Sequence, residues 1–348
     1  GANNTGFGHR TLADNTTGQK NVAVGANALD SNQTGGFVTA VGYDALTANT
    51  ASENTAIGGN AMMSNTSGAY NTACGMNALR ENTTANNNTA VGDEALRENT
   101  TGTQNVAVGA LALDANTTAS HNTAIGFASL SENTTGESNT GLGDNALVNN
   151  TTASSNTAIG RNALIMATTG GVNTAVGAFC GDAVTTGSEN TAMGVSCFTD
   201  NTTGSNNVAI GRSAMLNNTT ANNNTAVGHS ALMANTTGAA NVAIGAYCLD
   251  GQTTPNDNTG VGVNCLTDTT TGAQNTGVGR AAGANLTTGS NNTLIGYQAG
   301  TSSSPAAMVT GSNTVCLGNN SVNDLFCADT SISSSDARDK TDVEDFKH

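Results

Sequence analysis

The chain has 348 residues and a formal net charge of −15; only 10% of its residues are charged, 3% are aromatic and none is tryptophan. So few large side chains exclude an ordinary globular core of two or three domains. The scarcity of Lys and Arg argues against nucleic acid as a partner, and no apolar run reaches the roughly 18 residues of a transmembrane helix, so no membrane insertion is expected.

A five-residue phrase of the form Asn-Thr-Ala-Val-Gly recurs along the chain, nineteen times in all. The spacing is 17 residues, except for 16 between Gly42 and Gly58 and 22 between Gly296 and Gly318. A fixed period of this length is the signature of a solenoid, in which each repeat stacks on its neighbours. The phrase ends at Gly8, Gly25, Gly42, Gly58, Gly75, Gly92, Gly109, Gly126, Gly143, Gly160, Gly177, Gly194, Gly211, Gly228, Gly245, Gly262, Gly279, Gly296 and Gly318.

Each copy predicts a short strand followed by a tight turn. The residue before the glycine is apolar in every copy, as at Val91, and two positions earlier stands Thr89 or, in other copies, valine. Side chains two apart in a strand share a face. We therefore expect the Val91 column to be buried together with the small Ala95 column and the large apolar Leu96 column. The Asn-Thr-Thr-Gly stretch that follows is typical of a turn.

The fold predicted for residues 1–300 is all-β, a parallel β-solenoid (β-roll) of 17-residue coils. Identical residues then stack, so Asn88 lies between Asn71 and Asn105 and their amides form a ladder. With rungs about 4.8 Å apart, the coils make a rod of roughly 90 Å. Each coil buries few apolar side chains but must order the backbone of 17 residues, so a single thin rod is marginally stable. We therefore expect several chains to associate.

The cysteines fall in columns that other copies fill with small or apolar residues, which predicts buried free thiols. In-register side chains point the same way, which is poor disulfide geometry, and no Cys-x-x-Cys pair indicates zinc. Four cysteines lie in the alanine column, Cys180, Cys197, Cys248 and Cys265, and Cys74 lies in the valine column. The histidines stand at variable positions and predict neither a metal site nor a cofactor: His9, His121, His229 and His348.

Residues 301–335 break the pattern and predict an irregular last coil and a connector. The next stretch, SISSSDARDKTDVEDF, resembles the start of the peptidase S74 intramolecular chaperone domain, which ends phage tail fibres and tailspikes. That resemblance implies a trimeric β-rich fibre and self-cleavage at Ser335-Asp336, with Ser335 as nucleophile and Lys340 as its assisting base. Only residues 336–348 of such a domain are present, so cleavage is expected only in a chain that carries the whole domain.

The repeated phrase also resembles the head repeats of trimeric autotransporter adhesins, which implies left-handed β-rolls packed as trimers. We expect the homotrimeric shaft of a viral tail fibre, located on the virion and exposed to the extracellular medium. Its expected partners are other virion tail proteins and a host-cell surface receptor, such as a glycan. Free cysteines fit assembly in a reducing cytoplasm. The alternative is the head of a bacterial trimeric surface adhesin.

Two further classes fit the sequence less well. A polysaccharide depolymerase needs paired carboxylates, but acidic residues such as Asp93, Glu94 and Glu98 keep to no fixed column, so no active site is expected in the repeats. Ice binding would use regular threonine arrays, yet threonine alternates with valine in the strand. Large residues after the glycine, such as Tyr43 and Phe127, are expected in exposed turns, as is Tyr297.

Overall fold

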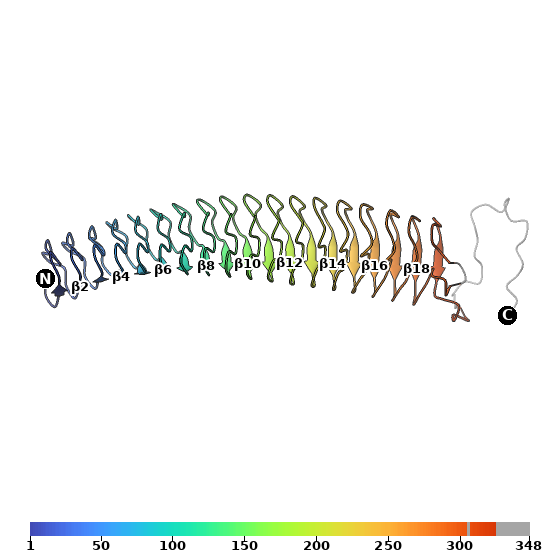
Figure 1. Ribbon diagram of the computed structural model, residues 1–348, viewed down its shortest axis with the longest axis horizontal. Coiled ribbons are helices and arrows are strands. Elements are labelled where there is room, and N and C mark those ends of the chain that lie inside the picture. The colour runs from blue at the N-terminus through green and yellow to red at the C-terminus, as the bar shows by residue number, and fades with distance from the viewer. Residues whose placement is uncertain (305–306, 325–348) are drawn as a thin grey trace, which may run out of the picture.

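The computed structural model describes residues 1–304 and 307–324 and is all-β in that part, with no helix. Nineteen strands of three residues form one parallel sheet along a bowed rod, and each coil contributes one strand (Figure 1). The predicted parallel β-solenoid is therefore confirmed. The strands are β1 (Thr5–Phe7), β2 (Val22–Val24), β3 (Thr39–Val41), β4 (Thr55–Ile57), β5 (Thr72–Cys74), β6 (Thr89–Val91), β7 (Val106–Val108), β8 (Thr123–Ile125), β9 (Thr140–Leu142), β10 (Thr157–Ile159), β11 (Thr174–Val176), β12 (Thr191–Met193), β13 (Val208–Ile210), β14 (Thr225–Val227), β15 (Val242–Ile244), β16 (Thr259–Val261), β17 (Thr276–Val278), β18 (Thr293–Ile295) and β19 (Val315–Leu317).

Equivalent residues of successive coils lie directly above one another. Val91 of β6 pairs with Val108 of β7, as the 17-residue period predicts. The register also survives where the period changes, because Thr39 still pairs with Thr55 across the 16-residue coil. The 22-residue spacing near the end brings β18 against β19 in the same way. Extra or missing residues are therefore absorbed in the turns and not in the sheet.

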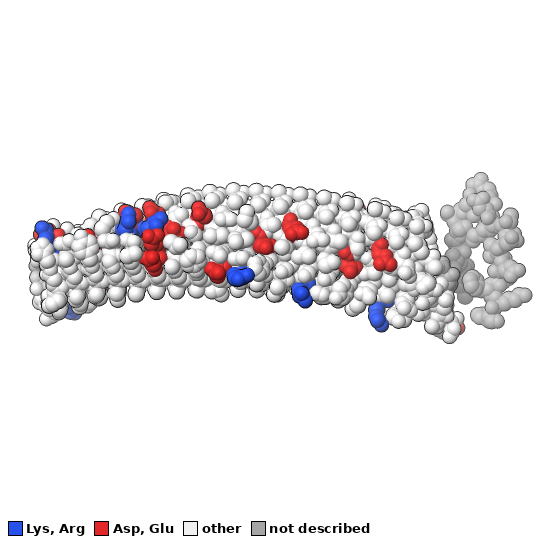
Figure 2. Space-filling model, in the orientation of Figure 1, with Lys and Arg blue, Asp and Glu red and all other residues white. Residues whose placement is uncertain are grey.

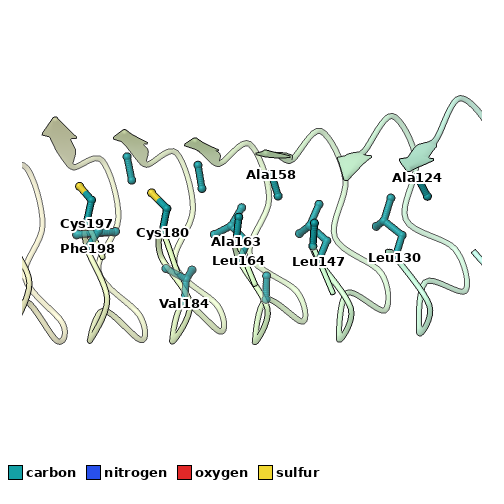
Figure 3. Packing of buried hydrophobic residues seen from close by; sticks show 14 of the residues in the cluster. Ala124, Leu130, Leu147, Ala158, Ala163, Leu164, Cys180, Val184, Cys197 and Phe198 are labelled. Atoms are coloured by element: carbon teal, nitrogen blue, oxygen red, sulfur yellow. The ribbon is translucent and has the colours of Figure 1, made fainter. Parts of the chain in front are cut away.

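The core consists of small side chains and one large one per coil. The strand centre Ala90, the small-column Ala95 and Leu96 are all fully buried. Figure 3 shows equivalent residues stacked inside successive coils, with Leu130 and Leu147 in adjacent coils. The expected burial of the valine column is wrong, because the strands turn their central residue inward.

The reason for this inversion is the thinness of the coil. At Gly277, which replaces the central alanine in β17, a Cβ atom would lie 2.6 Å from Sγ of Cys265 and 2.9 Å from Cγ of Leu266. The strand centre therefore packs against the leucine column and has room for little more than a methyl group. A β-branched side chain is accommodated on the outer side of the strand, where nothing in the chain opposes it.

Two columns of buried asparagines bind backbone N–H and carbonyl groups that the turns leave without a backbone partner. Oδ1 of Asn88 accepts from the backbone N–H of Asn105 at 2.9 Å, and its Nδ2 donates to the carbonyl of Gly102 at 2.8 Å. The second column includes Asn99, whose Nδ2 donates to the same Gly102 carbonyl at 3.0 Å and to Oδ1 of Asn82 at 3.2 Å. Buried polar groups need such partners. The predicted stacking of Asn88 between Asn71 and Asn105 is confirmed, but the bonds between these coils run from backbone N–H to amide oxygen, and amide-to-amide bonds occur in the second column.

The turns depend on backbone conformations with positive φ. Gly92 has φ of 136°, and a Cβ atom there would lie 2.5 Å from the carbonyl carbon and oxygen of Gly109 in the next coil. Leu96 adopts φ of 53°, a left-handed conformation that costs a residue with a side chain about 1–2 kcal/mol. It is held there because this conformation directs the leucine side chain into the core.

Candidate interaction surface

The most continuous surface feature is the outer strand face, which we define as the outward side chains of β1 to β19. Each strand contributes two of them: its first residue, threonine or valine, and its last, which is apolar in all nineteen strands. Val91, Ile125 and Leu142 expose 37%, 37% and 41% of their surface. The result is an apolar strip that runs the length of the rod.

The outer strand face is uncharged from end to end. None of its positions in the nineteen strands holds Lys, Arg, Asp or Glu. The hydroxyls of its threonines, such as Thr89 and Thr157, form no hydrogen bond with any described residue of the chain. Cys74 also lies on this face and is exposed, so its expected burial is wrong for the same reason as that of the valines.

Charged and aromatic residues border this face at the ends of several strands. The post-glycine edge consists of the residues that directly follow the phrase glycine, such as Asp144, Arg161, Arg212 and Arg280. The pre-asparagine edge consists of the residues that directly precede the strand-entry asparagine: for example, His121, Glu189 and Asp257. All seven are exposed. Figure 2 shows how sparse the charges are, with isolated basic residues along one margin of the rod.

Most ion pairs lie in a charged cluster on the coils of β5 to β7. Arg97 contacts Glu94, Glu98 and Asp114, and Arg80 contacts Glu81 at 2.6 Å. Among the described residues the only other ion pair joins Arg10 to Asp30 at 2.9 Å. Partial burial raises the pKa of Asp114 above its usual value, although a hydrogen bond from Ser131 opposes the shift. Exposed pairs of this kind contribute little to stability.

The four cysteines of the alanine column are fully buried, which confirms that part of the prediction. They form two stacked pairs, Cys180 with Cys197 and Cys248 with Cys265. A hydrogen bond with Cys197 and burial raise the pKa of the Cys180 thiol far above its usual range, and the same causes act on Cys248. Within the second pair the same hydrogen bond with Cys248 lowers the pKa of Cys265. All four side chains are nevertheless fully buried among alanines and leucines, where they pack as small apolar groups.

The predicted cleavage residues Ser335, Asp336 and Lys340 lie outside the described residues. Within residues 1–304 and 307–324, no three His, Cys, Asp or Glu side chains are grouped as a metal site would require. Of the large residues expected in exposed turns, Tyr43, Phe127 and Tyr297 are indeed exposed. The part of the chain that is described also holds no helix long and apolar enough to cross a membrane.

Comparisons with known proteins found no match. No protein-family model matches the chain, and no curated protein matches it. The outer strand face is thus the feature from which a function has to be argued. Sequence reasoning missed it because the valine column was assigned to the core.

Proposed function

We propose that the chain is the shaft of a viral tail fibre, in which three copies pack side by side through the outer strand face. The observation that carries this proposal is the unbroken apolar strip along β1 to β19, which has no charge on it. Large exposed apolar patches on soluble proteins mark interaction sites. A strip as long as the rod is best covered by an equally long partner, and a second copy of the chain has that length.

The size of the face supports this arrangement. Nineteen rungs span roughly 90 Å, and two outward columns are about 7 Å wide. The strip alone therefore covers about 600 Å² per copy, and its two edges add to this. A stable interface buries about 800 Å² on each partner. Burial of exposed side chains such as Val108 and Ile244 would also add the apolar contacts that a single thin coil lacks.

The sides of the rod away from the outer strand face would then form the surface of the fibre. They hold the threonine-rich turns and the charged cluster, and they are the sides available to a host receptor, such as a glycan. Other tail proteins would join the shaft at its ends. We place the protein on the virion, and the same rod on a bacterial cell surface is the alternative.

The C-terminal segment supports the fibre over the adhesin. A chain extended by a full chaperone domain is expected to cut itself at Ser335-Asp336, with Lys340 lowering the barrier by activating the Ser335 hydroxyl. A Ser335→Ala variant of that extended chain should remain uncut. A gene that continues beyond His348 into a membrane anchor would instead indicate the adhesin.

Self-association is tested by light scattering on the purified chain. We expect a particle of about three times 34.4 kDa. A Val108→Asp/Ile244→Asp double variant should be monomeric, because it places charges on the outer strand face. The control is Thr118→Asp/Thr237→Asp, which adds the same charge at exposed turn positions. A wild-type monomer, or equal behaviour of the two variants, would contradict the proposal.

A further inference from the structure

Two pairs of opposite charges are divided between the two edges of the outer strand face at the same separation. Arg212 follows Glu189 by 23 positions, and Arg280 follows Asp257 by 23. A third pair has the same separation: Asp144 follows His121 by 23 positions, and an imidazole N–H can donate a hydrogen bond to a carboxylate. The later member of each pair lies on the post-glycine edge and the earlier one on the pre-asparagine edge. In every case the two residues are one rung apart along the rod.

These matches have no explanation within one chain. Each pair is divided between opposite ends of the strands, and none of the six side chains forms an ion pair or a side-chain hydrogen bond among the described residues. Arg280 does lie over the ring of Tyr297, at 5.9 Å from its centroid, which leaves its guanidinium exposed beside the face. The charges are placed to meet something beyond their own chain.

Apolar residues obey the same rule. Val195 on the post-glycine edge follows Val172 on the pre-asparagine edge by 23 positions. Val172 is 60% exposed and Val195 is 52% exposed, so each presents most of its side chain to solvent. This pair joins two apolar side chains, whereas the charged pairs join side chains of opposite sign. One geometry therefore accounts for four pairs.

From this we infer that copies of the chain pack parallel and in register, with the post-glycine edge of each against the pre-asparagine edge of its neighbour. In a parallel arrangement about an axis along the rod, opposite edges meet at every interface. Arg212 of one copy then faces Glu189 of the next, and Arg280 faces Asp257. An extended arginine side chain is long enough to cross one rung.

An antiparallel arrangement would leave these charge pairs unmade. Turning one rod end for end brings like edges together, so the arginines of one copy would face the post-glycine edge of the other. Charge pairs at the rim of an interface contribute mainly to orientation and register. The edges would therefore select the arrangement, and the outer strand face between them would supply most of the affinity. This inference depends on the self-association proposed above.

The parallel register is tested by exchanging the acidic and basic residues of the two edges in the full chain. Glu189→Arg/Asp257→Arg places arginine opposite arginine at both pairs and should weaken association by about 100-fold, since each interface loses two pairs and gains two repulsions. Combining it with Arg212→Glu/Arg280→Glu restores the pairs and the net charge of the wild type, and should restore association. Asp200→Arg/Asp268→Arg is the control, with the same charge change at exposed positions away from both edges. Sedimentation equilibrium at low and high salt gives the association constants.

The outcomes separate the two proposals. Loss with the first variant, recovery with the exchanged variant and no effect of the control support the parallel register. If the wild type associates but the edge variant matches the control, or the exchange restores nothing, the register is wrong while self-association stands. A wild-type chain that stays monomeric at every concentration overturns both.

Discussion

Replacement of one buried asparagine should locally destabilise the rod, and Asn139→Ala is the clearest case. Oδ1 of Asn139 accepts from the backbone N–H of Asn156 at 2.9 Å, and its Nδ2 donates to the carbonyl of Ala153 at 2.8 Å. The carbonyl keeps a second donor, Nδ2 of Asn150 at 3.0 Å. The N–H of Asn156 has no such replacement, and it is buried in the next coil.

The magnitude follows from these contacts. Two lost hydrogen bonds cost about 1 kcal/mol each, and an unsatisfied buried N–H adds about 1–3 kcal/mol. We therefore expect Asn139→Ala to cost about 3–5 kcal/mol. Each coil contacts only its neighbours, so the loss should be concentrated in the coils of β9 and β10. Hydrogen exchange should show faster exchange of the Thr140–Leu142 and Thr157–Ile159 amides, with distant coils unchanged.

The matched control is Asn217→Ala, which removes an asparagine side chain that forms no hydrogen bond among the described residues. Its effect should stay within about 0.5 kcal/mol. Equal exchange rates in the two variants would refute the view that the amide columns stabilise the coils, and would leave leucine and alanine packing as the main source of stability.

Three further substitutions have defined outcomes. Ala167→Asn should stabilise the chain by about 1 kcal/mol in a denaturant titration, since the buried Oδ1 of Asn150 has no partner where the second asparagine column is interrupted; no gain would contradict this. Gly92→Ala should cost at least ~2 kcal/mol because of its φ and its contact with Gly109, whereas Gly59→Ala, with nothing within 4 Å, should cost little. Burial, with the nearby charge of Asp200, raises the pKa of Asp182, so this carboxyl binds its proton more tightly in the folded chain. Its contribution to stability therefore falls as pH rises from the usual aspartate pKa through the raised one. Asp182→Asn should make the measured fall in stability between pH 3.5 and pH 7 smaller in urea titrations, and an unchanged profile would refute the assignment.

The sequence was sufficient to predict the stacking but not which way the strand faces. Side chains alternate between the two faces of a strand, so Thr89 and Val91 share a face. The hydrophobicity of Val91 then favours that face as the buried one. The decisive quantity is the width of the coil, which depends on where the leucine column lies in three dimensions. Nothing in the strand itself reports that width.

Compensating exchanges in the core could have revealed it. Where Cys248 and Cys265 enlarge the small column, the strand centre twelve residues later is glycine instead of alanine, at Gly260 and Gly277. A Cβ atom at those two positions would lie 2.5 Å and 2.6 Å from the sulfurs. Conversely, Leu294 occupies a strand centre where the leucine column holds glycine. Such paired exchanges point to the strand centre as an interior position, although Cys180 and Cys197 keep alanine twelve residues later, at Ala192 and Ala209.

Because the strand centres face inward and the valine column faces outward, the larger apolar side chains of the strands lie on the surface of the rod. Inside, each coil buries two small residues and usually one leucine, while two buried asparagines occupy space that an ordinary core fills with larger apolar groups. Outside, the nineteen strands present the β-branched and other large residues that such a core would have buried. Burial of apolar area is the main favourable term in folding, and the outer strand face offers a continuous strip of such area along the whole rod. Association through that face would extend the core across chains, and this is the physical reason for proposing that the shaft is built from several copies.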